Sequence, residues 1–65
     1  MKIREAEDLA GGQIQLAKVL SVTTRAIQKW NKESEDLPQE RFYQLAGMVA
    51  MKEWKPVNGQ KFPKV

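Results

Sequence analysis

Five side chains recur at helical spacing along one stretch of the chain: Thr24, Arg25, Gln28, Lys29 and Lys32. Residues three and four positions apart are neighbours on a helix surface, so these five are expected to share one face. Every one of them can donate a hydrogen bond, three are cations, and none is an acid. Such a face is suited to recognising hydrogen-bond acceptors and negative charge.

Double-stranded DNA offers both of these features. The major groove of B-DNA admits one α-helix, and its base edges present acceptors on guanine that suit Arg or Lys and a donor–acceptor pair on adenine that suits Gln. Thr24 is short enough, at the start of the helix, for close approach to a thymine methyl group or a phosphate. A polar helix face is ordinarily just solvated. This face, however, carries no acid, and its helix follows another short helix across a tight turn; together these two features favour DNA.

A second element that can bind DNA is expected at the start of the preceding helix. Gly11 and Gly12 stop one helix, and Gln13 begins the next. The first N–H groups of a helix lack backbone partners and form the positive end of the helix dipole, so this start suits a phosphate. Contacts to the DNA backbone fix the register of a protein, and contacts to bases confer specificity.

Four helices are predicted to position these groups. They are expected at residues 2–10, 13–20, about 23–32 and 39–53. Thr23 is a good N-cap for the third helix, which is expected to bury Ile27 and Trp30 and to fray near residues 31–34. Pro38 suits the first turn of the fourth helix, because its missing N–H has no partner to lose there.

The end of the chain is predicted to be a basic tail at residues 55–65 that follows a helical domain at residues 1–54. Acids and bases balance over the first fifty residues, so the net charge of +3 comes entirely from the end of the chain. The pair Asn58-Gly59 is a strong hairpin signal, but a disordered tail is an equal alternative. Trp54 and Phe62 are expected either at a dimer interface or inside the monomer.

The composition limits the classes of function. The chain has 65 residues, no cysteine and no histidine, so it lacks disulfides and the usual ligands and bases of catalytic sites. No cofactor or metal is implied, and an enzyme is the least supported class. A core of this size contributes only about 3–5 kcal/mol, so dimerisation is a plausible support. No apolar run is long enough for a membrane span and no secretory signal is visible, so a cytoplasmic location is expected.

The segment from Gln13 to Trp30 resembles the helix-turn-helix of the phage Cro and repressor family. The Leu-Ala pair at 16–17, the Val-Thr turn at 22–23, and Ile27 and Trp30 fall where that motif has core residues. The Leu-Pro pair at 37–38, followed by Arg41, is similar to the start of the fourth helix in these proteins. The resemblance covers residues 1 to about 52. Ser21 departs from it, because the family usually has glycine in this turn.

The resemblance implies an all-α domain of four or five helices with an extended or short β-hairpin tail. It also implies a transcriptional repressor that dimerises weakly, or only on DNA, at a pseudo-palindromic operator in the cytoplasm of a bacterial host. Two reading helices would then enter successive major grooves about 34 Å apart. Carried over to this chain, Gln13 would contact a phosphate, and Thr23 and Lys32 the DNA backbone. The base edges would be contacted by Thr24, Arg25, Gln28 and Lys29.

Two other functions remain open at this point. The chain can be a different phage or antitoxin-type helix-turn-helix regulator, acting in activation, replication or packaging, with the same DNA interface. It can also be a protein-interaction module that keeps the helical scaffold without binding DNA. The second alternative predicts no salt-dependent affinity for DNA.

Overall fold

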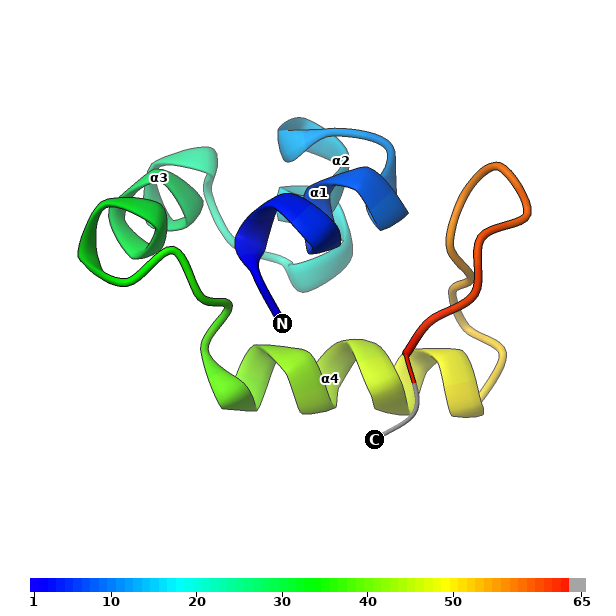
Figure 1. The fold of residues 1–65 in the computed structure, drawn as a ribbon. Coiled ribbons are helices and arrows are strands. Elements are labelled where there is room, and N and C mark those ends of the chain that lie inside the picture. Colours follow the sequence, from blue (N-terminus) through cyan, green and yellow to red (C-terminus); the bar gives the residue numbers. More distant parts are fainter. Residues whose placement is uncertain (64–65) are drawn as a thin grey trace.

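A computed structural model describes residues 1–63 of the protein, which form four helices (Figure 1). These helices are α1 (Ile3–Ala10), α2 (Gln13–Leu20), α3 (Thr24–Glu33) and α4 (Gln39–Ala50). The described residues contain no strand, so the fold is all-α, as the sequence predicts. None of the four helices combines the length and the apolar character that crossing a membrane requires.

The core lies where α1, α2 and α3 meet one side of α4 (Figure 1). It contains the apolar face of each helix and one residue of the α3–α4 connection. The buried side chains of this core are Ile3, Ala6, Leu9, Ala10, Leu16, Ala17, Leu20, Ile27, Leu37 and Leu45. Within α1 and α2 these residues recur at the spacings of three and four that predict the helices, while α3 and α4 each contribute one buried residue, Ile27 and Leu45.

Two left-handed residues make the corners on either side of α2. Gly11, with a φ of 92°, ends α1, and its N–H bonds to the carbonyls of Glu7 and Asp8. Ser21, with a φ of 59°, ends α2 in the same conformation. A side chain is disfavoured there, which explains why glycine suits this turn and why serine is accommodated with strain.

The start of α3 is capped as the sequence predicts, because the Thr23 hydroxyl accepts a hydrogen bond of 3.2 Å from the Ala26 N–H. Two expectations for this helix are wrong in detail. The helix does not fray near residue 31 but continues to Glu33, and the backbone N–H of Ser34 closes its last turn by donating to the Trp30 carbonyl at 3.0 Å. Trp30 is half-buried rather than buried, and it packs at the edge of the core.

Helix α4 begins at Gln39, as predicted, but ends before the predicted residue 53. Pro38 is the N-cap of α4 rather than a residue of its first turn. The helix ends at Ala50, three residues early, because Lys52 adopts a left-handed φ of 59°. The chain then reverses, and the Glu53 N–H bonds to the Met48 carbonyl at 2.8 Å.

The described part of the tail folds back on α1 without forming a strand. Asn58 and Gly59 both have positive φ, and the Gln60 N–H bonds to the Val57 carbonyl at 3.2 Å, so the turn predicted from Asn-Gly is present. The Val57 N–H bonds to the Leu9 carbonyl at 2.9 Å instead of pairing across the turn. The end of the basic tail at residues 64–65 lies outside the described residues.

Trp54 and Phe62 pack within the monomer. The Phe62 ring stacks on Phe42 of α4 with a centroid distance of 5.4 Å, and Trp54 meets Phe62 edge-on at 6.2 Å. All three rings are half-buried against the core. This is one of the two arrangements expected from the sequence, and a role for these residues at a dimer interface stays a prediction.

Candidate nucleic-acid interface

The outer face of α3 is exposed and lined by donors. Arg25, Gln28, Lys29 and Lys32 surround one shallow, open hollow. Thr24 is half-buried at the first turn, and the capping residue Thr23 is exposed beside it. The side chains that the sequence places on one helix face are therefore together on one surface.

This face is joined to the start of α2 by a hydrogen bond between two side chains. The Gln28 amide donates to the Gln13 side-chain oxygen at 3.3 Å, across fifteen residues of sequence. The Gln13 amide donates at 3.5 Å to the carboxylate of Glu7 at the end of α1. One donor of each glutamine amide is used in these bonds, and the oxygen of Gln28 remains available to accept from a base.

The start of α2 carries free backbone donors next to these glutamines. Gly12 is its N-cap and provides no side-chain cap, and the first backbone bond of the helix runs from Leu16 N–H to the Gly12 carbonyl. The N–H groups of Gln13, Ile14 and Gln15 have no acceptor among residues 1–63. Three free donors at a positive helix end are the arrangement that binds a phosphate.

One acid lies at the edge of this donor-lined face of α3. Because α3 extends to Glu33, this carboxylate comes within 3.9 Å of the Lys29 ammonium. Both side chains are well exposed, so the pair contributes little and Lys29 is free to leave it for a stronger anion. Arg25 and Lys32 form no ion pair with any residue in the described part of the chain.

Two residues of α4 link this helix to α3 and to the end of α2. The Arg41 guanidinium lies 5.9 Å from the centroid of the Trp30 ring on α3. Arg41 also donates at 2.8 Å to the Gln44 side-chain oxygen, and the Gln44 amide donates at 3.3 Å to the Leu20 carbonyl at the end of α2. This link was not predicted, although the three-residue spacing of Arg41 and Gln44 is a signal for their pairing.

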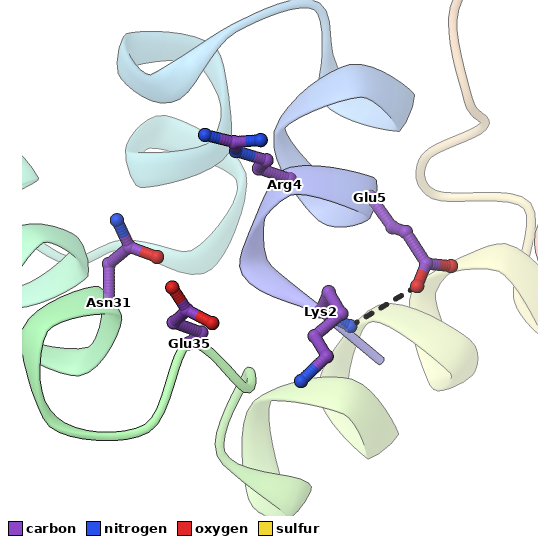
Figure 2. Close-up of a pocket in the computed structure, with 5 residues that line it drawn as sticks. All are labelled: Lys2, Arg4, Glu5, Asn31 and Glu35. Carbon is purple, nitrogen blue, oxygen red and sulfur yellow. Dashed lines mark hydrogen bonds between the residues drawn. The ribbon is translucent and has the colours of Figure 1, made fainter.

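A pocket elsewhere in the fold has the wrong charge for a polyanion. Figure 2 shows that it lies between the start of α1 and the end of α3 and that two bases and two acids line it with Asn31. The Lys2 backbone N–H donates at 3.4 Å to Glu5, which caps α1, and the Lys2 ammonium pairs with Asp36 at 3.1 Å. The lining carries as many acids as bases, and Lys2 and Glu5 already have partners within the fold, so the surface of α2 and α3 is the better candidate.

No protein-family model, curated protein or solved structure matches the chain. Among residues 1–63, no three acidic side chains come close enough together to hold a metal ion. The function is therefore inferred from the side chains of α2 and α3 and from their arrangement.

Proposed function

We propose that the protein is a sequence-specific, double-stranded DNA-binding transcriptional repressor of the Cro type. The observation that carries the proposal is the hydrogen bond between Gln28 and Gln13. It places the donor-lined face of α3 directly beside the free N–H groups of α2. Groups suited to bases and groups suited to phosphates thus lie on one continuous surface.

In this proposal α3 enters the major groove and the start of α2 meets the flanking strand. Arg25 and Lys29 donate to guanine acceptors, and Gln28 pairs with adenine. Thr24 contacts a base edge where the helix enters the groove, while Thr23 and Lys32 contact phosphates. The free amides of α2 clamp one further phosphate and so fix the depth and register of α3.

Two copies would read the two halves of a pseudo-palindromic operator. Their α3 helices would lie about 34 Å apart, which is one turn of B-DNA. A protein seated there competes with other proteins for the same stretch of DNA. Binding that blocks a promoter would therefore repress transcription, and another position of the site relative to the promoter would indicate activation or a different role for the same interface.

Selection of bound sequences from a random DNA pool tests the proposal. The expected result is a pair of related half-sites in inverted orientation, spaced by one helical turn. The logarithm of the affinity for the selected site is also expected to fall linearly with the logarithm of the salt concentration, because each phosphate that the protein neutralises releases counterions. A protein-interaction module would enrich no sequence and show no salt-dependent affinity, and that result would refute the proposal.

A further inference from the structure

The chain after α4 runs back across the fold and packs against α4 and α1. Figure 1 shows it leaving the end of α4, passing the end of α1 and returning to α4. We call residues 54–62 the strap. Within it Pro56 is buried, and Val57, Gln60 and Phe62 are half-buried. Side chains covered to this extent contact the helices, so the strap is part of the folded domain and not a solvated tail.

Both ends of the strap join one cluster of aromatic rings on α4. Phe62 stacks on Phe42 of α4 with a centroid distance of 5.4 Å, and Trp54 meets Phe62 edge-on at 6.2 Å. Rings at these distances attract each other beyond the effect of burial alone. The residues between Trp54 and Phe62 therefore form a closed loop whose base is fixed on α4.

The middle of the strap binds the last turn of α1. The Val57 N–H donates to the Leu9 carbonyl at 2.9 Å, and the Gln60 amide donates to the Asp8 carbonyl at 3.2 Å. The same amide donates to the Val57 carbonyl at 3.3 Å. The last carbonyls of a helix lack intrahelical partners, so the strap satisfies two groups that the end of α1 leaves open.

Val57 also contacts the corner that joins α1 to α2. A Cβ added to Gly11 would lie 3.6 Å from both methyl carbons of Val57, so this side chain lies against the glycine backbone. The next residue, Gly12, is the N-cap of α2, and its N–H bonds to the Glu7 carbonyl at 2.7 Å. Two consecutive glycines give this corner wide conformational freedom, and Val57 limits that freedom from outside.

We propose that the strap positions the start of α2 for phosphate binding and that Val57 is the positioning residue. The inference rests on the proposed function, because it concerns the same helix start. The N–H groups of Gln13, Ile14 and Gln15 can bind one phosphate only if they are aimed at it together, since hydrogen bonds weaken steeply with misalignment. The strap therefore raises affinity for DNA without contacting it. It leaves base preference unchanged, because α3 reads the bases.

Nuclear magnetic resonance of the full chain without DNA tests the positioning itself. Val57→Ala removes both methyl groups that lie against Gly11, whereas Val57→Ile keeps both branches and is the matched control. The amide signals of residues 13–15 are expected to shift in Val57→Ala and to stay close to the wild type in Val57→Ile. Gln60→Met keeps the length of the side chain but removes its donor, and a smaller shift of the same amides is expected.

Operators that carry one neutral methylphosphonate in place of a phosphate test the effect on binding. For the wild type and Val57→Ile, neutralising the phosphate that α2 contacts is expected to lower affinity by about tenfold, as for the loss of a hydrogen bond to a charged group. For Val57→Ala the same change is expected to cost little, because that contact is already lost. Its affinity for the unmodified operator is expected to be lower by about tenfold after correction for the folded fraction, with unchanged base preference.

A purely structural role for the strap predicts a different pattern. It gives Val57→Ala and the wild type the same loss at every neutralised phosphate, with weaker binding that follows from the folded fraction alone. That result, or unshifted amides at residues 13–15, would overturn the proposal. A wild type that binds no DNA would refute the proposed function instead, and the amide signals would then decide on their own whether the strap positions α2.

Discussion

The Gln28 side chain on α3 donates a hydrogen bond of 3.3 Å to the Gln13 side chain at the start of α2. This bond connects the residue best suited to reading adenine with the helix end best suited to holding a phosphate. A shift of α2 along the DNA backbone would therefore change the orientation of the Gln28 amide. The two glutamines are expected to act as one unit in recognition.

A double-mutant cycle on these glutamines measures that coupling. Gln13→Ala removes the acceptor, Gln28→Ala removes the donor, and the double variant removes both. The losses in operator affinity are expected to be non-additive by about 0.5–1.5 kcal/mol, because each single change already breaks the shared bond. The cycle of Gln13→Ala with Lys32→Ala is the control, and equal coupling in both cycles would show that the bond has no special part in binding.

Arg25 is expected to read a base. Its guanidinium is exposed at the start of α3 and pairs with no acid in residues 1–63. Arg25→Ala is therefore expected to cost about 1–3 kcal/mol of operator binding and to relax the preference at one base position. Affinities for a set of single-base operator variants measure both effects. A uniform loss across all variants would assign Arg25 to a phosphate instead.

Lys32 is expected to behave in the opposite way, as a contact to the DNA backbone. Lys32→Ala should weaken binding to all sequences alike and lower the slope of log affinity against log salt by about 1, because one phosphate is no longer neutralised. Titrations of one operator and one unrelated duplex at several salt concentrations give the slope. A changed sequence preference at unchanged slope would contradict this assignment.

Ser21 is expected to limit the stability of the domain. Its φ of 59° is left-handed, where a side chain is disfavoured and glycine is not. Ser21→Gly is therefore expected to raise the free energy of unfolding by about 0.5–1 kcal/mol, and Ser21→Val to lower it by at least that much. Urea denaturation followed by circular dichroism measures both. Destabilisation by glycine would mean that the serine hydroxyl has a contact beyond those in the described structure.

The sequence predicts the helices well because each has a clear local signal. The apolar spacing of Leu16, Ala17 and Leu20 and the capping hydroxyl of Thr23 depend only on neighbours in the chain. The early end of α4 was not predictable, because it follows from the left-handed φ of Lys52 and not from a glycine or proline at that point. A backbone conformation that a residue type seldom adopts gives no signal in the sequence.

The candidate site, too, could be predicted only in part from the sequence. Its face was predictable from the periodicity of residues 24–32, whereas the bonds that hold it join separate helices. The contact of Gln13 with Gln28 spans fifteen residues, and that of Gln44 with Leu20 spans twenty-four. Glu33 was placed outside the helix, so its pairing with Lys29 was missed as well. Such contacts depend on how the helices pack against one another, and the spacing of residues within one helix does not specify that packing.

Arg41 is expected to be a positioning residue for α3. Its guanidinium lies 5.9 Å from the Trp30 ring centroid and donates at 2.8 Å to Gln44, which in turn holds the end of α2. Arg41→Met keeps much of the aliphatic stem but loses both interactions, so it is expected to lower the free energy of unfolding by about 1–2 kcal/mol. Operator affinity should fall further than this loss of folded protein explains, because α3 is no longer held against α4.

Fluorescence separates positioning from a direct contact with DNA. In a Trp54→Phe background, Trp30 is the remaining tryptophan, so its emission reports on its own surroundings. Arg41→Met is expected to shift that emission before any DNA is added, and Arg41→Lys to restore part of the signal and of the affinity, since a cation returns over the ring. An unchanged emission together with a salt slope lowered by about 1 would instead make Arg41 a phosphate contact.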